Sequence, residues 1–330
     1  MASISPFRCL SAGTLLSFSA AALLSIGGGC GGGSGKPSGG GASAPPAASA
    51  PAESETAAPS ATEEPAPAAG ESVAAAPKKE ESKPAASNTA TGGTGTLTGV
   101  VTLDGSWSAL APLFTKGDES VKDAAVCAHD NIPNNSVVVN ADAGNGVANV
   151  FVYLAKVPKG VEVPAPSEEP VIMDQKGCLF FPRALVVQKG QTILVKSDDA
   201  VPHNVHTFPT LSAPFNSICP PNERDGLKLV YEGVEREPVS VKCDIHPWMQ
   251  AWHLPLDHPY AAVTDGEGKF TIENVPAGDL SFRVWHEKAG FVEKSLPVSV
   301  KADETNEIRI SVGAAQLAGL PTLRQAVAQK

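Results

Sequence analysis

A long segment without large apolar residues limits what this chain can fold into. Residues 31–95 contain one valine, Val73, and no leucine, isoleucine, methionine or aromatic residue. Such a segment cannot bury enough apolar surface to offset the entropy lost on ordering. Its Gly-rich beginning and its Ala/Pro/Glu/Ser-rich continuation are typical of a linker. We therefore predict a disordered tether over 31–95, a folded region over 96–313 and a tail over 314–330.

The first thirty residues are typical of an export signal. Arg8 is their only charged residue, and an apolar stretch follows it. Three glycines then lead into Cys30, an arrangement that resembles a bacterial lipoprotein signal over 1–30. The resemblance implies a lipid on Cys30, attachment to a membrane, and a periplasmic or cell-envelope location. Ordinary secretory cleavage nearby is the alternative, and both outcomes place the fold where disulfides are permitted.

Short apolar runs recur between turn signals from residue 96 onward. This pattern predicts an all-β sandwich, with no long amphipathic helix. The sequence D-G-E-G at Asp265–Gly268 predicts a hairpin turn. The predicted strands are Thr96–Leu103, Asn149–Ala155, Pro170–Met173, Ala184–Gln188, Thr192–Ser197, Val239–Cys243, Tyr260–Thr264, Lys269–Ile272, Leu280–His286 and Ile308–Val312.

Charge and cysteine spacing exclude several classes of function. The formal net charge is −10, with 25 basic and 35 acidic residues. Proteins that bind nucleic acid need a basic face, so we expect no nucleic-acid partner. The six cysteines form no C-x-x-C pair, which excludes c-type haem attachment and the common zinc-knuckle spacings.

Side chains that ligate metals cluster directly after a predicted strand. The sequence V-K-C-D-I-H-P-W-M occupies residues 241–249, and P-H-N-V-H lies about forty residues upstream. One thiolate, two imidazoles and a weak thioether form the ligand set of a blue-copper electron-transfer site. Zinc fits less well, because a thioether is a poor ligand for it. The candidate ligands are His203 or His206, Cys243, His246 and Met249.

The choice between the two upstream histidines is open on spacing alone. Residues three apart on a strand point to opposite faces, so only one of His203 and His206 can face the same site as the cysteine.

These segments resemble the cupredoxin family, and amicyanin-type members most of all. The resemblance rests on Asp198–Val205, on C-x-x-H-x-x-M at 243–249, and on C-L-F-F-P at Cys178–Pro182, and it extends over about 170–257. It implies a Greek-key sandwich over 166–257 with one type 1 copper site. The implied roles are equatorial ligands for His203, Cys243 and His246, an axial ligand for Met249, and a brace between the ligand loops for Asn204.

The same resemblance implies a route for electrons. In this architecture the second histidine ligand lies near the surface in an apolar patch. His246, framed by Pro247 and Trp248, is thus expected to be the point where electrons enter and leave. The alternative is that Trp248 only packs the loop.

Two flanking segments resemble a different family. The sequences around 95–105, 147–154, 262–272 and 275–285 are similar to the two halves of a carboxypeptidase regulatory-like (transthyretin-like) domain. The resemblance implies that 96–165 and 258–313 form one small sandwich into which the copper domain is inserted. The alternative is one extended cupredoxin domain with additional segments at its ends.

The remaining cysteines and histidines support weaker expectations. We expect two of Cys127, Cys178 and Cys219 to pair, and favour Cys127–Cys178, although sequence does not determine connectivity. A second metal site at His253, His258 or His286 is conceivable. Polar anchors at a domain junction are the more ordinary interpretation of these histidines.

We predict a carrier of single electrons rather than an enzyme. Multicopper oxidases need His-x-His pairs, and the seven histidines here form none. The predicted partner is a redox protein such as a c-type cytochrome or a dehydrogenase, and the acidic balance favours a basic one. Two alternatives are copper storage or delivery without electron transfer, and a structural or carbohydrate-binding β-sandwich.

Overall fold

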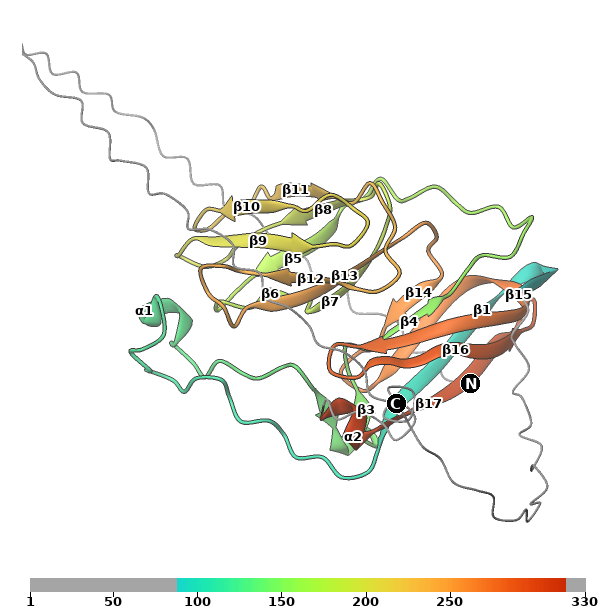
Figure 1. Ribbon diagram of the computed structural model, residues 1–330, viewed down its shortest axis with the longest axis horizontal. Coiled ribbons are helices and arrows are strands. Elements are labelled where there is room, and N and C mark those ends of the chain that lie inside the picture. Colours follow the sequence, from blue (N-terminus) through green and yellow to red (C-terminus); the bar gives the residue numbers. More distant parts are fainter. Residues whose placement is uncertain (1–87, 319–330) are drawn as a thin grey trace, which may run out of the picture. The chain divides into compact units, whose positions relative to one another are not determined.

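The computed structural model describes residues 88–318, which form several β-sheets and almost no helix (Figure 1). The all-β prediction is therefore confirmed. The export signal, Cys30, most of the tether and most of the tail lie outside the described residues. Within the described residues, no helix has the length and apolar character needed to cross a membrane.

Strands from both ends of the described chain share one sheet. β1 (Thr89–Asp104) pairs antiparallel with β15 (Lys269–His286) and parallel with β17 (Thr305–Gly313). The second half of β15 pairs with β4 (Phe151–Leu154) and β16 (Gly290–Val300). The sheet also contains β2 (Val139–Asn140), β3 (Gly146–Val147) and β14 (Ala261–Val263). The chain leaves this sheet after β4 and returns to it at β14, so the intervening residues form a separate body of structure.

The predicted tether, 31–95, extends too far along the chain, because residues 89–95 belong to β1. β1 begins at Thr89, and Thr89 and Ala90 pair with Asp279 and Gly278 of β15. Backbone hydrogen bonds hold this end of the strand, so it needs no large apolar side chains. A side chain at Gly278 would collide with the carbonyl oxygen of Thr89, and the glycine permits this close approach.

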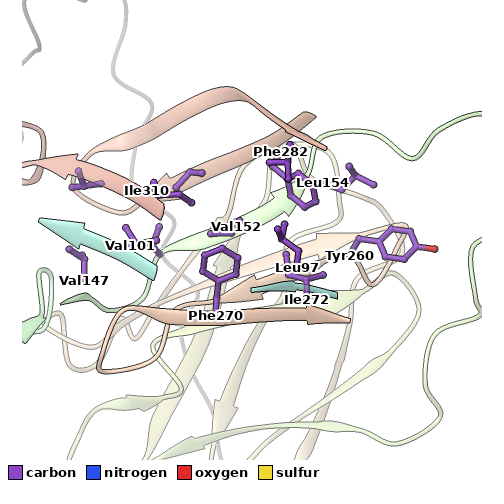
Figure 2. Packing of buried hydrophobic residues seen from close by; sticks show 14 of the residues in the cluster. Leu97, Val101, Val147, Val152, Leu154, Tyr260, Phe270, Ile272, Phe282 and Ile310 are labelled. Carbon is purple, nitrogen blue, oxygen red and sulfur yellow. The ribbon is translucent and has the colours of Figure 1, made fainter. Parts of the chain in front are cut away.

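Alternating apolar residues fill the interior of this first sheet. Leu97, Val101 and Leu103 of β1 are buried, as the alternation in the sequence predicts. Figure 2 shows Phe270 and Phe282, from the two halves of β15, among the buried side chains of this cluster.

The inserted region forms two further sheets. The five-stranded sheet has the order β10 (Asn216–Cys219), β9 (His203–Phe208), β12 (Val239–Lys242), β13 (Gln250–Leu256) and β7 (Ala184–Gln188). The four-stranded sheet has the order β11 (Leu227–Val230), β8 (Thr192–Val195), β5 (Val171–Gln175) and β6 (Phe180–Phe181). β13 and β7 run parallel, as do β5 and β8. Both sheets contribute to one buried apolar cluster, as a β-sandwich requires.

A connection from the first sheet packs on this second core. Between β1 and β2 the chain passes through α1 (Ala124–Cys127), and Val121, Cys127 and Ile132 are buried in the cluster of the inserted sandwich. The expectation that all of 96–165 belongs to the flanking sandwich is therefore wrong for this part. Its apolar side chains gain burial against the other core, and the chain returns to the first sheet at β2, which η1 (Ala141–Ala143) connects to β3.

An apolar cluster and one ion pair join the two bodies of structure. Phe151 and Tyr153 of β4 pack with Leu254 of β13. Arg183 makes a two-pronged ion pair with Glu287, with Nε–Oε1 and Nη2–Oε2 distances of 2.6 and 2.9 Å. Its Nη1 also donates to the carbonyl of Gln250, 3.2 Å away. The flanking sandwich is thereby fastened next to the end of the predicted ligand loop.

Truncating this ion pair should cost more stability than truncating an exposed one. The Arg183 and Glu287 side chains are 15% and 7% exposed, so Glu287→Ala leaves a mostly buried guanidinium without its carboxylate. We expect a loss of about 3 kcal/mol in the free energy of unfolding, measured with urea. The control is Glu267→Ala, whose partner Lys269 is exposed, with an expected loss under about 1 kcal/mol. Equal losses would show that the buried pair stabilises the fold no more than the exposed pair does.

Candidate metal centre

The ends of two neighbouring strands bring the predicted ligands together. β9 begins at His203, and β12 ends one residue before Cys243. The two strands pair antiparallel, with Lys242 opposite His206. The loop after β12 is closed by hydrogen bonds from Cys243 N to Met249 O (3.3 Å) and from Met249 N to His246 O (2.9 Å). This tight turn holds three of the four predicted ligands on seven residues.

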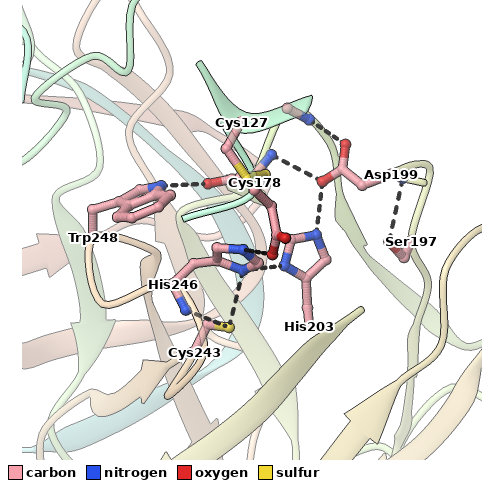
Figure 3. Close-up of a disulfide and its surroundings, with 10 residues drawn as sticks. Cys127, Cys178, Ser197, Asp199, His203, Cys243, His246 and Trp248 are labelled. Carbon is pink, nitrogen blue, oxygen red and sulfur yellow. Dashed lines mark hydrogen bonds and ion pairs between the residues drawn. A yellow bond between two sulfur atoms is a disulfide. The ribbon is translucent and has the colours of Figure 1, made fainter. Parts of the chain in front are cut away.

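Three donor atoms converge in a site without solvent exposure. Sγ of Cys243 and ring nitrogens of His203 and His246 all lie within 4.8 Å of one another. The two Nδ1 atoms are 2.9 Å apart, and Sγ of Cys243 is 3.8 Å from Nδ1 of His246 (Figure 3). His203 and His246 are 0% exposed and Cys243 is 1% exposed.

The surroundings of Cys243 favour its ionised form. Burial by itself raises the pKa of this thiol, but the neighbouring imidazoles of His203 and His246 and the backbone N–H groups of Asn204 and His246 favour its charged form. Together they lower its pKa to about 6. A thiolate is the form of cysteine that ligates metals, so the site holds its sulfur ready at neutral pH.

His203 is oriented by a buried carboxylate that the sequence analysis missed. Nε2 of His203 lies 2.8 Å from Oδ2 of Asp199. This oxygen also accepts from the backbone N–H of Cys178, and Oδ1 accepts from that of Gly177. Burial opposes the charged imidazole, but Asp199 and Cys243 outweigh it, and the pKa of His203 is raised. A carboxylate behind a histidine ligand fixes the ring and leaves the other nitrogen to face the metal. The only sequence signal for this role is an aspartate four residues before the histidine.

His246 is fully buried. The expectation that this ligand lies near the surface, where electrons would enter and leave, is therefore wrong. Nε2 of His246 is 2.9 Å from Oδ2 of Asp123, a residue of the connection between β1 and β2. The disulfide sulfurs of Cys127 and Cys178 also lie within 4.8 Å of a ring nitrogen of His246. The sequence predicted neither contact, because these residues are far from the ligand loop along the chain.

Asn204 connects the two ligand-bearing segments, where the resemblance expects a brace. Its Oδ1 accepts from the backbone N–H of Asp244 at 2.6 Å, and its Nδ2 donates to the Asp244 carboxylate at 2.8 Å. Because Asn204 follows His203 and Asp244 follows Cys243, this contact ties the two ligands to each other.

The other loop residues occupy distinct positions. Met249 is fully buried, whereas Pro247 is exposed. Trp248 is half-buried, donates from Nε1 to the carbonyl of Cys178 (3.1 Å), and packs edge-on against Phe114. These contacts are those of a side chain that packs the loop.

The structure separates the two upstream histidines. His203 faces the cluster, whereas the side chain of His206 is 28% exposed and pairs with Asp244 on the outside of the sheet. His206 is thus not part of the donor cluster.

The second metal site that was conceivable from the sequence is not assembled within residues 88–318. His253, His258 and His286 do not come together in a group of close ligand atoms. Each has its own hydrogen-bond partner. Nδ1 of His253 lies 3.1 Å from the hydroxyl of Tyr231, Nε2 of His258 donates to the carbonyl of Leu154, and Nδ1 of His286 accepts from Lys288 N. Burial lowers the pKa of all three imidazoles. These histidines are neutral structural groups.

Within residues 88–318, the cysteines divide into one disulfide and two free thiols. Cys127 and Cys178 are bonded, the pair that the sequence analysis favoured. Both belong to the core of the inserted sandwich, so the bond lies within that core. Cys219 and Cys243 are free and buried.

The donor set fits a thiophilic metal. It combines an ionised sulfur with two imidazole nitrogens that face each other away from water, and Met249 lies buried on the same loop. Thiolate and thioether suit Cu(I), while imidazole also suits Cu(II), so this set fits copper.

Comparisons with known proteins find similarity to parts of solved structures only. No protein-family model matches the chain, and no curated protein matches it. Among solved structures, it is similar to a purple cupredoxin from Nitrosopumilus maritimus (22% identity, 26% of this chain and 98% of that one, TM-score 0.22). Amicyanin from Paracoccus versutus matches at 15% identity, over 29% of this chain and 86% of that one, with a TM-score of 0.24.

A larger protein also matches. The copper-containing nitrite reductase from Thermus scotoductus is 20% identical over 30% of this chain, with a TM-score of 0.24. The chain spans only 25% of that protein's length. Each of these three matches covers less than a third of the present chain.

The two free thiols should ionise at widely separated pH values. The lowered pKa of Cys243 makes its thiolate form as pH rises through about 6, whereas burial raises the pKa of Cys219 to about 11. We expect the metal-free protein to gain ultraviolet thiolate absorbance in two steps. Cys243→Ser should remove the first step and Cys219→Ser should not. A single step well above neutral pH would contradict the assigned surroundings of Cys243.

Proposed function

We propose that this chain is a type 1 (blue) copper protein that carries single electrons between redox partners outside the cytoplasm. The observation that carries the proposal is the convergence of one ionised thiol and two imidazoles in a site without solvent exposure. His203, Cys243 and His246 would hold the metal, and Met249 would supply the weak axial sulfur. Bound copper would supply a one-electron Cu(I)/Cu(II) couple.

The protein's own residues hold the ligands in place before any metal binds. The Asn204–Asp244 contact fixes the separation of the two ligand segments, and Asp199 fixes the ring of His203. Burial in the sandwich core excludes water from the donor atoms. A site held in this way resists rearrangement when its charge changes, which favours rapid electron transfer.

Location and partners are part of the proposal. The amino-terminal pattern around Cys30 supports a lipid-anchored protein of the periplasm or cell envelope. The acidic net charge of −10 supports a basic redox partner, such as a c-type cytochrome or a dehydrogenase. The function needs no substrate pocket and no acid–base pair, so we propose a carrier rather than an enzyme.

Copper loading should produce the spectrum of a thiolate-bound metal. We expect an intense visible charge-transfer band and a type 1 EPR signal, both lost in Cys243→Ser. The matched control is Cys219→Ser, which removes the other buried thiol and should retain both signals. His206→Ala should retain them as well. Survival of the band in Cys243→Ser, or its absence from the wild type, would overturn the copper assignment.

A second measurement separates electron transfer from copper storage. An electron carrier should titrate reversibly with one electron and keep its copper in the presence of a chelator. Met249→Leu should keep the visible band and raise the potential by about 60 mV or more, a tenfold change in the one-electron equilibrium constant. A colourless Cu(I) protein that gives its metal to a chelator would favour storage or delivery.

A further inference from the structure

We propose that residues 113–132 form a cap that closes the outward edge of His246, with Asp123 as a positioning residue for this ligand. We call this segment the cap. The role toward copper rests on the proposed function, whereas the closure of the imidazole edge concerns the metal-free chain and stands independently of it.

The cap has its own hydrogen-bonded frame. Its two arms are joined by bonds from Leu113 N to Ile132 O (2.8 Å), from Ile132 N to Phe114 O (2.9 Å) and from Gly117 N to Ala128 O (2.8 Å). The cap therefore keeps a defined shape as it leaves the flanking sheet.

The cap is also fastened to the inserted sandwich. Val121 and Ile132 are 4% and 1% exposed and share the core of that sandwich. The disulfide joins Cys127 of the cap to Cys178, just before β6. Covalent and apolar contacts thus hold the cap on the side of the site where His246 lies.

The backbone places Asp123 against the imidazole. Asp123 has φ 55° and ψ 42°, in the left-handed region, and its carbonyl accepts from Val126 N and Cys127 N at the start of α1. Left-handed geometry is unfavourable for a residue with a side chain, and such sites often mark functional positions. Here the geometry directs Oδ2 to within 2.9 Å of His246 Nε2, with the aspartate side chain 34% exposed.

This contact determines which nitrogen of His246 can bind a metal. An ionised carboxylate only accepts hydrogen bonds, so Nε2 of His246 carries the proton. In the neutral ring, Nδ1 then has a free electron pair, and Nδ1 is the atom that faces His203 and Cys243. Asp123 therefore acts through His246, in the same way that Asp199 acts through His203.

The two carboxylates differ in origin. Asp199 lies four residues from its histidine, whereas Asp123 lies 123 residues from His246 and reaches it only through the cap. The cap also denies a redox partner direct contact with the His246 ring. A partner approaching this side of the site meets the cap first.

Chemical modification of the metal-free full-length protein tests the closure. Diethylpyrocarbonate modifies accessible imidazoles, and peptide mass spectrometry identifies them. His129 is exposed and His206 partly so, which makes them internal references. We expect His246 to be protected in the wild type and to react at least tenfold faster in Asp123→Ala and in the double variant Cys127→Ser/Cys178→Ser.

The matched control is Asp118→Ala. This cap carboxylate contacts Ser120 and does not touch His246, so the protection of His246 should not change. Asp123→Asn keeps an acceptor oxygen and should restore most of the protection if Asp123→Ala loosens the cap. Modification of His246 in the wild type at the rate of His206 would overturn the proposal.

Two spectroscopic readouts test the positioning role. Nitrogen NMR of the metal-free wild type should show His246 protonated at Nε2, and Asp123→Ala should shift the population toward the other tautomer. In the copper-loaded protein, Asp123→Ala should change the reduction potential and the EPR parameters, whereas Asp118→Ala should not.

The outcomes separate the two proposals. A chain that never binds copper but protects His246 through Asp123 would refute the proposed function and keep the cap. A blue protein in which Asp123→Ala changes neither the reactivity nor the tautomer of His246 would keep the function and refute the cap.

Discussion

The pairing of β9 with β12 is the constraint on which the candidate site depends. Val241 lies opposite Thr207 and Lys242 opposite His206. The beginning of β9 therefore lies beside the end of β12, and His203 and Cys243 are both buried there. A shift of one residue would turn each side chain to the other face of the sheet. The register is locked where the strands end, because Asn204 and Asp244 bind each other through backbone and side-chain groups. The buried thiolate is tolerable only because this arrangement surrounds it with donors.

The flanking sandwich does more than carry the inserted one. Its apolar contact with β13 and the Arg183–Glu287 pair hold it close to the ligand loop, and the connection that follows β1 reaches over to cover His246. The three donor side chains and Asp199 thus come from the inserted sandwich. Asp123, the carboxylate behind His246, comes from the connection that leaves the flanking sheet. The residues of the candidate site and the segment that covers His246 therefore come from different parts of the chain.

Sequence reasoning succeeded where the chemistry is local. The alternation in Thr96–Leu103 and Lys269–Ile272 predicted strands that the structure contains, although Lys269–His286 forms one continuous strand. Among the longer strands it missed β9, β10, β11 and β16. The β9 segment H-N-V-H-T-F, for example, lacks clean alternation of apolar and polar residues. Sequence reasoning also assigned Thr89 and Ala90 to the tether, since backbone pairing with β15 leaves no apolar signature.

The sequence by itself determined the all-β class and the donor set, because strand periodicity and the C-x-x-H-x-x-M spacing are local properties of the chain. Only the tertiary structure decided which upstream histidine joins the donors, that His246 is covered, and that Asp123 and Asp199 stand behind the two imidazoles. The register of β9 settled the first point. The others depend on contacts such as that between Asp123 and His246, which are made by packing between separate bodies of structure, and no local pattern encodes that packing.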